Sequence, residues 1–207
     1  MLPCPYRAPT VPPRVPVREV WGYGNIEDMP YNPEMHHRRS IRLKEFDYTQ
    51  PGAYFITIVA QNREWLFGDI VDDEMRLNPL GRVVEKEWER LSQRFENLKL
   101  DEFMVMPNHV HGIIVITDRD NSMYGDKDGI EHFGKPIKGS IPTIVRSFKS
   151  ATTLRINLMR QSKGLQVWQR NYFEHVIRNE SEWGEIREYI RQNPDNWEVD
   201  LENPKGL

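Results

Sequence analysis

Two histidines that lie two residues apart are the first candidates for metal-binding residues. His109 and His111 fall in the run 106–115 (MPNHVHGIIV), whose apolar, β-branched end is typical of a strand. Side chains two apart on a strand point to the same face, so the two imidazoles are expected side by side. Two neutral imidazoles can bind one divalent ion and leave positions for a third ligand and for substrate oxygens. The spacing also allows a local hydrogen bond for one histidine and a surface position for the other.

A tyrosine and an asparagine near the end of the chain form the second candidate. Tyr189 and Asn193 are four residues apart and share one face of a predicted helix, beside the apolar stripe of Trp183, Ile186 and Ile190. A phenol close to a metal-bound phosphate can act as a nucleophile, because the cation stabilises both the phenolate and the charge that develops on the phosphate. The Asn193 amide oxygen would lie one turn away. The same periodicity allows Tyr189 merely to extend the apolar stripe.

The elements that must position these residues can be predicted from periodicity, caps and turns. Asn78 followed by Pro79, and Asn179 with Glu182 three residues on, are typical helix starts. The polar stretch 117–139 predicts a loop. The predicted order is a strand at 53–59, a helix at 79–94, strands at 98–106 and 109–116, a helix at 142–159, a strand at 167–177 and a helix at 179–192. This order predicts an α+β fold of the ferredoxin-like βαββαβ type, an antiparallel sheet with an extra C-terminal helix that carries Tyr189.

The length and composition indicate one domain with extensions. The chain has 207 residues, and its first 28 contain six of its 15 prolines, at positions 3, 5, 9, 12, 13 and 16, so 1–28 is predicted to be a disordered leader. The domain is predicted over 29–197, with a tail at 198–207. The single cysteine, Cys4, excludes an internal disulfide and a cysteine-built metal site. No apolar run reaches the roughly 18 residues of a membrane span, so a cytoplasmic protein without a membrane partner is expected.

The net charge of -3 conceals a strong segregation of charge along the chain. Taken alone, it argues against a nucleic-acid ligand, whose binding depends on cations that neutralise phosphates. Two stretches without any acidic residue contradict that average, although each is also compatible with an ordinary solvated surface. The basic residues are Arg38, Arg39, Arg42 and Lys44 in 36–44, and Lys135, Lys138, Arg146, Lys149, Arg155, Arg160, Lys163 and Arg170 in 132–172.

Several separated motifs resemble those of a known enzyme family. The run His109-Val110-His111, followed far downstream by residues 188–194 (EYIRQNP), is similar to the HUH single-tyrosine transposases. More narrowly, the chain resembles the REP-associated tyrosine transposases, a bacterial branch of that family. Supporting stretches are 106–108 (MPN), 140–150 (SIPTIVRSFKS) and 168–175 (WQRNYFEH), so the resemblance covers roughly residues 29–197.

The resemblance implies a catalytic site and a DNA substrate. His109 and His111 would hold Mg²⁺ or Mn²⁺, with Asn193 as third ligand; Gln192 is the alternative, one residue out of register. Tyr189 would attack a phosphodiester of single-stranded or hairpin DNA to give a 5′-phosphotyrosine link and a free 3′-OH. The basic residues expected to bind the DNA backbone are Arg38, Arg39, Arg42, Lys44, Arg146, Lys149, Arg155 and Arg170. The branch implies a bacterial, cytoplasmic monomer, whereas the broader family includes homodimers.

Other functions remain compatible with the same sequence. A four-stranded sheet with aromatic residues can bind single strands without catalysis. A replication-initiator or relaxase-type nicking enzyme would share the histidine pair. A metallohydrolase would need a water nucleophile and a carboxylate base, and no such base is evident in the sequence beside the histidines.

Overall fold

The computed structural model describes residues 47–117, 137–200 and 202–204. The predicted leader at 1–28 and the basic arm with Arg38, Arg39, Arg42 and Lys44 lie outside the described residues. The same holds for 118–136 of the predicted loop and for 201 and 205–207 of the predicted tail. Within the described part of the chain, no helix is long and apolar enough to cross a membrane.

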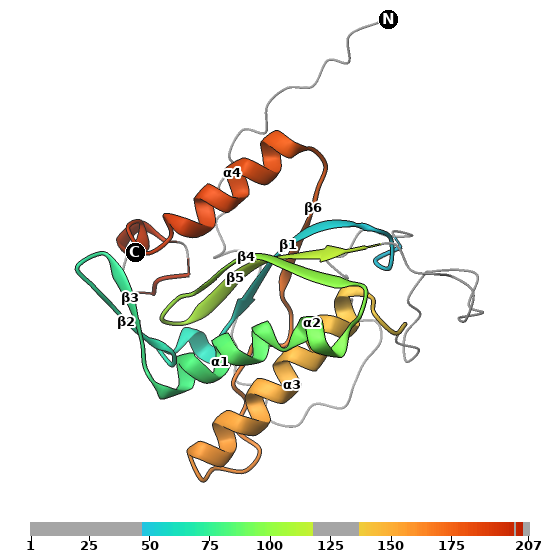
Figure 1. Cartoon of the computed structure of the whole chain (residues 1–207). Helices are drawn as coiled ribbons and strands as arrows, with labels where there is room; N and C mark the ends of the chain where they lie inside the picture. Colours follow the sequence, from blue (N-terminus) through green and yellow to red (C-terminus); the bar gives the residue numbers. More distant parts are fainter. Residues whose placement is uncertain (1–46, 118–136, 201, 205–207) are drawn as a thin grey trace, which may run out of the picture. The chain divides into compact units, whose positions relative to one another are not determined.

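A four-stranded antiparallel sheet is the centre of the fold (Figure 1). Its strands are β1 (Gly52–Val59), β4 (Leu98–Val105), β5 (His109–Ile116) and β6 (Phe173–Ile177), in the order β4-β5-β1-β6. β1 pairs with both β5 and β6, and β5 pairs with β4, in each case antiparallel. With helices between the first and second and between the third and fourth of these strands, the arrangement is the predicted ferredoxin-like α+β fold.

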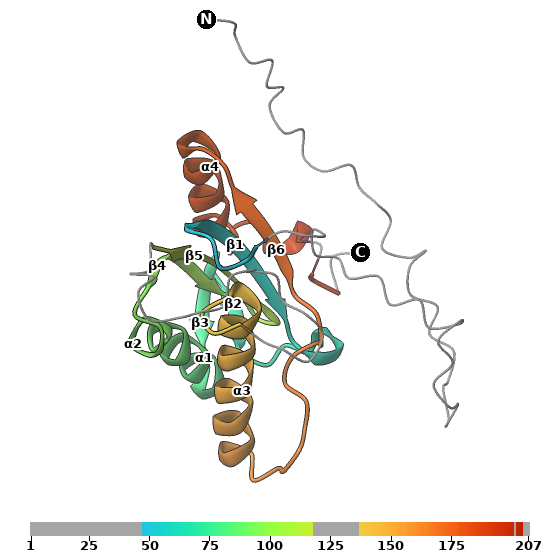
Figure 2. The same cartoon turned by 90° about the vertical axis from the view of Figure 1, so that its right-hand side faces the viewer.

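Helices cover both faces of this sheet (Figure 2). α1 (Pro79–Glu89), the short α2 (Leu91–Arg94) and α3 (Ile141–Met159) lie on one face, and α4 (Glu180–Arg191) lies on the other. The side chains of Asn78 and Asn179 each accept a backbone N–H from the first turn of the helix that follows, as their predicted role at helix starts requires. Ser140, which was not predicted as a cap, does the same for α3.

The alternation of side chains along the strands produces two apolar clusters, one on each face. Under α1 and α3 the larger cluster includes Ile56, Ile58, Val110 and Ile114 together with Trp88 and Phe148 from the helices. Under α4 the smaller cluster consists of Ala53, Phe55, Ile113, Ile177 and Ile190. The odd-numbered residues of β5, including both histidines, therefore face α4.

One element was not predicted. β2 (Gly68–Val71) and β3 (Glu74–Leu77) form a separate two-stranded hairpin. The turn residues Asp72 and Asp73 both have positive φ, as expected for a two-residue turn of a hairpin. The strands are only four residues long. β3 (EMRL) alternates charged and apolar residues over this minimum length, whereas β2 (GDIV) does not alternate.

The last strand is shorter than predicted, because a half-buried lysine binds the preceding segment. β6 begins at Phe173, not at 167. The Lys149 ammonium, on α3, donates to the carbonyl oxygens of Gln169 (2.8 Å), Arg170 (3.3 Å) and Asn171 (2.8 Å). These carbonyls are occupied by the ammonium group, and the segment makes one isolated bridge, between Trp168 and Ala60, the residue that follows β1.

Two glycines allow a matched test of the packing around β5. A Cβ added at Gly112 would overlap Cζ2 of Trp88 and lie 2.8 Å from its Cη2, and Trp88 is itself stacked on Phe103 at 4.4 Å between ring centroids. We expect Gly112→Ala to lower the free energy of unfolding by about 1–3 kcal/mol through overpacking. Gly184, within α4, has open space around it, so Gly184→Ala should raise the free energy by up to about 1 kcal/mol. Urea denaturation of both variants checks this, and equal effects would contradict the packing described.

Candidate active site

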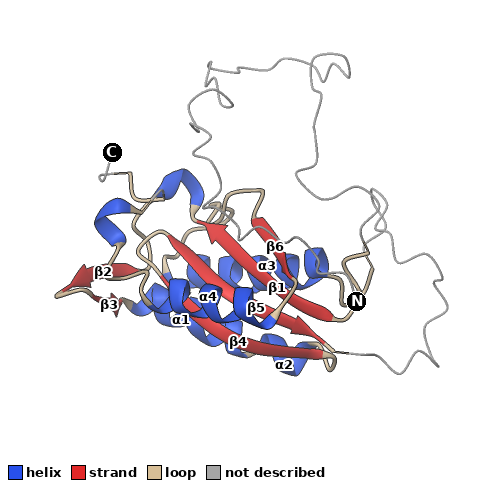
Figure 3. Cartoon of the chain, turned by 90° about the horizontal axis from the view of Figure 1, so that it is seen from above, coloured by secondary structure: helices blue, strands red, loops and turns tan. Residues whose placement is uncertain are grey.

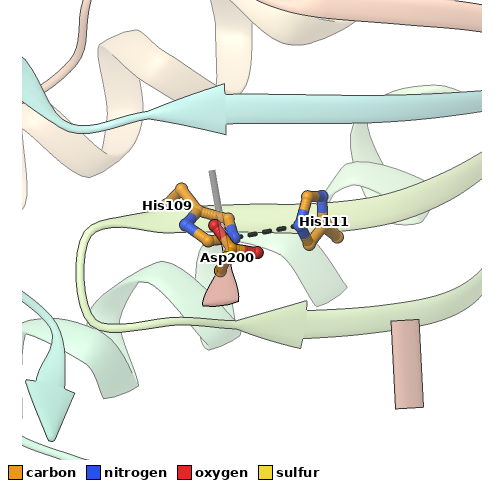
Figure 4. Close-up of side chains that lie close together, drawn as sticks. All are labelled: His109, His111 and Asp200. Atoms are coloured by element: carbon orange, nitrogen blue, oxygen red, sulfur yellow. Dashed lines mark hydrogen bonds between the residues drawn. The ribbon is translucent and has the colours of Figure 1, made fainter. Parts of the chain in front are cut away.

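The two histidines of β5 lie in contact beneath α4. Nε2 of His109 and Nε2 of His111 are 2.9 Å apart, and both side chains are buried. The two rings meet at a steep angle, with their Nε2 atoms turned toward one another and toward Asp200 (Figure 4). The proximity predicted from the spacing of the histidines is therefore observed, and their converging nitrogens are arranged as two ligands of one ion would be.

Hydrogen bonds to the outer ring nitrogens hold this orientation. Nδ1 of His109 lies 2.8 Å from Oδ1 of Asn108. The Asn108 amide nitrogen donates to the backbone oxygens of Glu202 (2.6 Å) and Arg63 (3.3 Å), so its Oδ1 is the acceptor toward His109. His109 must therefore carry its proton on Nδ1, which leaves the lone pair of Nε2 in the site.

The second histidine is held in the same way from β1. Nδ1 of His111 lies 2.9 Å from the hydroxyl of Thr57, which can either donate or accept. Burial lowers the pKa of His111 to about 3. Burial, and secondly the neighbouring His111, lower the pKa of His109 well below its ordinary value. Both imidazoles are consequently neutral at pH 7, which is the form that binds a metal ion.

α4 carries the tyrosine to this pair. The helix lies across β4 and β5 (Figure 3), and two ion pairs attach it to β4. Arg187 donates to Asp101 at 2.8 Å, and Arg191 donates to Glu102 at 2.7 Å. With the helix in this position, the Tyr189 hydroxyl lies 3.4 Å from Nε2 of His111.

The environment of Tyr189 does not by itself favour the phenolate. Its ring is 48% exposed, whereas its hydroxyl end lies against the buried histidines. Burial, followed by the negative charge of Asp200, raises the pKa of Tyr189 to about 12, and a hydrogen bond with Asn193 acts in the opposite direction. A nearby cation would therefore have to offset this cost for the phenol to act as a nucleophile near neutral pH.

A carboxylate that was not predicted completes the group. Asp200 lies beside the two histidines (Figure 4). One of its carboxylate oxygens, one ring nitrogen of His109 and one of His111 all lie within 4.8 Å of one another. It follows the 3-10 helix η3 (Trp197–Val199), and Trp197 packs against His109 with ring centroids 6.0 Å apart. The feature of the sequence that accompanies this aspartate is an aromatic residue, Trp197, three positions earlier. The two residues lie where the predicted domain (29–197) meets the predicted tail (198–207).

The two predicted alternatives for a third ligand have different surroundings. Asn193 is buried, and its amide nitrogen donates to Asp200 at 3.4 Å. Its Oδ1 is also buried, and it has no hydrogen-bond partner among the described residues. Gln192 is exposed, and its amide bonds to Glu188 at 2.6 Å. Asn193 therefore lies in the site and Gln192 lies outside it.

The donor atoms of the site fit a divalent ion. Two neutral imidazoles and a carboxylate form a mixed nitrogen and oxygen set, and the unpartnered Asn193 Oδ1 supplies a further oxygen. Burial is the largest influence on Asp200 and raises the pKa of its carboxyl. A bound cation would reverse this shift by favouring the carboxylate.

The predicted DNA-binding residues on α3 lie away from this group. Arg146, Lys149 and Arg155 belong to the helix that covers the opposite face of the sheet (Figure 2). Lys149 and Arg155 have partners within the protein. The Lys149 ammonium binds three backbone carbonyls, and Arg155 pairs with the buried carboxylate of Glu87 at 2.7 Å. Arg170 is exposed in the segment before β6.

Two Haemophilus influenzae proteins are similar in sequence to this chain. No family model matches the chain. A Haemophilus influenzae protein of unassigned function is 44% identical over 173 residues, which is 82% of this chain and 95% of the relative. A second Haemophilus influenzae protein, provisionally named a REP-associated tyrosine transposase, is 26% identical over 149 residues, which is 72% of this chain and 73% of that protein.

A solved structure shares the fold. It is a REP-associated tyrosine transposase bound to a REP hairpin, and it matches with a TM-score of 0.51 and 17% identity over 77% of this chain and 74% of that chain. The motifs around His109, His111 and Tyr189, the ferredoxin-like sheet and these relatives agree with one another. The chain is therefore similar in sequence to a protein provisionally named a REP-associated tyrosine transposase, and it shares its fold with a solved transposase of that kind.

Proposed function

We propose that this protein cleaves and rejoins single-stranded or hairpin DNA through a covalent bond between Tyr189 and a 5′-phosphate. The observation that carries the proposal is the 3.4 Å separation between the Tyr189 hydroxyl and Nε2 of His111, in a site where two neutral histidines converge. A tyrosine that only packed in the core would not require neighbouring side chains able to bind a metal ion.

The chemistry is a transesterification. The Tyr189 oxygen gives up its proton and attacks the phosphorus, the bond from phosphorus to the 3′-oxygen breaks, and that oxygen takes up a proton. The products are a 5′-phosphotyrosine and a strand with a free 3′-OH. Since one phosphodiester is exchanged for another, a 3′-OH can later displace Tyr189 and rejoin the DNA without ATP.

His109, His111 and Asp200 are the proposed ligands of a divalent ion, Mg²⁺ or Mn²⁺. When bound, such an ion supplies positive charge that stabilises the Tyr189 phenolate and the charge developing on the phosphate. Asn108 and Thr57 hold the histidine rings, and the Asn193 amide holds Asp200. These residues fix the ligand atoms before DNA arrives.

DNA as the partner is supported by the relative that was solved with a REP hairpin. Among the predicted contacts, Arg170, exposed in the segment that leads into β6, is the described candidate for phosphate binding. Arg146, on α3, lies across the sheet from the site. Arg38, Arg39, Arg42 and Lys44 remain predictions outside the described residues. Lys149 and Arg155 have partners within the protein, so their larger contribution is expected to be to stability.

The proposal is tested by incubation with a hairpin oligonucleotide that has single-stranded flanks, in Mn²⁺ or Mg²⁺. We expect a protein–DNA adduct that survives denaturation and disappears with EDTA. Binding without such an adduct would contradict the proposal and would favour a non-catalytic binding module.

Asp200 and Asn193 can be distinguished as metal ligands by Mn²⁺ titration. We expect Asp200→Asn to weaken Mn²⁺ binding by at least about tenfold, because it removes a charged ligand, and Asn193→Ala to weaken it less. Asp195→Asn, an exposed carboxylate on the same segment, is the matched control and should bind as the unmodified protein does. A larger loss for Asn193→Ala than for Asp200→Asn would instead make Asn193 the third ligand.

A further inference from the structure

An exposed aromatic side chain lies at the edge of the candidate active site without a role in the proposed chemistry. Phe173 is the first residue of β6, and it is 54% exposed. Among the described residues β6 is the outermost strand of the sheet on its side. A single exposed phenylalanine is not by itself evidence of a ligand, so the inference depends on where Phe173 lies.

The sheet places Phe173 in the same row as the metal-ligand candidates. Its partner on β1 is Thr57, and the partner of Thr57 on β5 is His111. Directly paired residues of neighbouring strands present their side chains on one face, here the face beneath α4. The hydroxyl of Thr57 holds His111, so one residue separates the exposed ring from the histidine pair.

The buried ring of Phe55 connects this phenylalanine to the nucleophile. Phe55 packs edge-to-face against Phe173 at 6.2 Å and against Tyr189 at 6.0 Å, and it is stacked on His111 at 5.5 Å, all between ring centroids. Phe173 and Tyr189 are therefore the two half-exposed aromatic rings around one buried ring. Their positions relative to each other are set by the core and do not depend on mobile side chains.

The segment that leads into Phe173 is also held firmly. The Lys149 ammonium binds the carbonyl oxygens of three consecutive residues, 169–171, and lies 5.6 Å from the ring centroid of Tyr172. The Trp168 indole donates to the Thr152 hydroxyl at 2.7 Å. Within this held segment Arg170 is exposed, three residues before Phe173. An aromatic face with a neighbouring cation is the combination that binds single strands, by stacking of a base and neutralisation of its phosphate.

We propose that Phe173 is a stacking platform for an unpaired base next to the phosphate that Tyr189 attacks. The inference rests on the proposed function, since it assumes a nucleotide strand at Tyr189. Such a contact would position the strand without selecting one base, because every base has a π face. Phe173 is accordingly a positioning residue.

The test measures binding separately from cleavage. In the Tyr189→Phe background, which is expected not to cleave, a hairpin with single-stranded flanks carries 2-aminopurine at each flank position in turn. When Phe173 is present, we expect the fluorescence of 2-aminopurine to be quenched at one flank position. Phe173→Ala should lose this quenching and should bind the flanked hairpin roughly tenfold more weakly, with unchanged binding of a hairpin that has no flanks. Phe173→Tyr should restore both.

A matched variant controls for the loss of an exposed apolar side chain. Leu158 is 69% exposed on α3, across the sheet, and Leu158→Ala should change neither quenching nor affinity. Thermal denaturation verifies that Phe173→Ala remains folded. Unchanged quenching and affinity in folded Phe173→Ala would overturn the inference.

The failure of this inference is distinguishable from failure of the proposed function. Covalent attachment is scored on the protein with Tyr189 intact, on the same flanked hairpin. An adduct together with quenching that does not depend on Phe173 would refute only the stacking platform. Quenching that depends on Phe173 without any adduct would support the platform and refute the nucleophile.

Discussion

Tyr189→Phe is expected to abolish covalent attachment to DNA, with a loss of at least roughly a thousandfold in the rate of adduct formation. The substitution removes only the hydroxyl, which lies 3.4 Å from Nε2 of His111. The ring contacts with Phe55 and His111 are retained, so the fold should be unaffected. Affinity for a hairpin oligonucleotide should stay within about twofold, because a lost transition-state interaction need not alter ground-state binding.

The measurement is a denaturing gel with a fluorescent, hairpin-containing oligonucleotide in Mn²⁺. Tyr172→Phe is a matched control, since Tyr172 packs against the apolar cluster on the opposite face of the sheet. That variant should form adduct at nearly the unmodified rate. Adduct formation by Tyr189→Phe would show that another residue is the nucleophile.

His109→Ala and His111→Ala are expected to weaken Mn²⁺ binding by about a hundredfold or more and to remove cleavage with it. Each substitution deletes one of only two imidazole ligands, and loss of even an outer partner of a metal ligand costs about 10–100-fold in affinity. Isothermal titration with Mn²⁺ measures the binding, and the adduct gel measures the cleavage. The two losses should occur together, because the same ion is proposed to stabilise the Tyr189 phenolate.

A third histidine on the same face serves as the control. His175, on β6, bonds to Glu182 at 2.7 Å and does not belong to the group of His109, His111 and Asp200. His175→Ala should keep the Mn²⁺ affinity of the unmodified protein, although it loses the hydrogen bond to Glu182. Full adduct formation by His109→Ala, or adduct formation that persists in EDTA, would contradict the metal-dependent mechanism.

Much of the fold could be predicted from local patterns. The strand at 109–116 and the helix near 179–192 follow from apolar periodicity and a cap, and the structure contains both. The hairpin from Gly68 to Leu77 could not be predicted in this way, since its strands are only four residues long. The residue at which the last strand begins could not be predicted either. It depends on Lys149, about twenty residues earlier, which binds the carbonyls before Phe173.

The candidate site shows the same division between local and tertiary information. That His109 and His111 share a face follows from the two-residue period of a strand. That their Nε2 atoms converge depends on Asn108 and Thr57, which no spacing reveals. Asp200 was missed because the chain must turn back after α4, with Trp197 packed on His109, to place that carboxylate beside the pair.

The basic residues of α3 illustrate why charge along a chain is an incomplete guide to a binding surface. An acid-free stretch predicted a phosphate track that included Lys149 and Arg155. In the folded protein, distant parts of the chain supply their partners, Glu87 for Arg155 and three backbone carbonyls for Lys149. Arg170, three residues before the proposed Phe173 platform, is exposed.

The most direct measurement is the identification of the modified peptide after reaction with a hairpin oligonucleotide labelled at either end. Trypsin would release Tyr189 in the peptide 188–191 (EYIR), between Arg187 and Arg191. We predict that this peptide carries the DNA and that the bound DNA is the 3′ fragment, joined through its 5′-phosphate, while the 5′ fragment is released with a free 3′-OH. DNA attached to another peptide, attachment of the 5′ fragment, or complete cleavage without attachment would contradict the proposal that Tyr189 is the nucleophile.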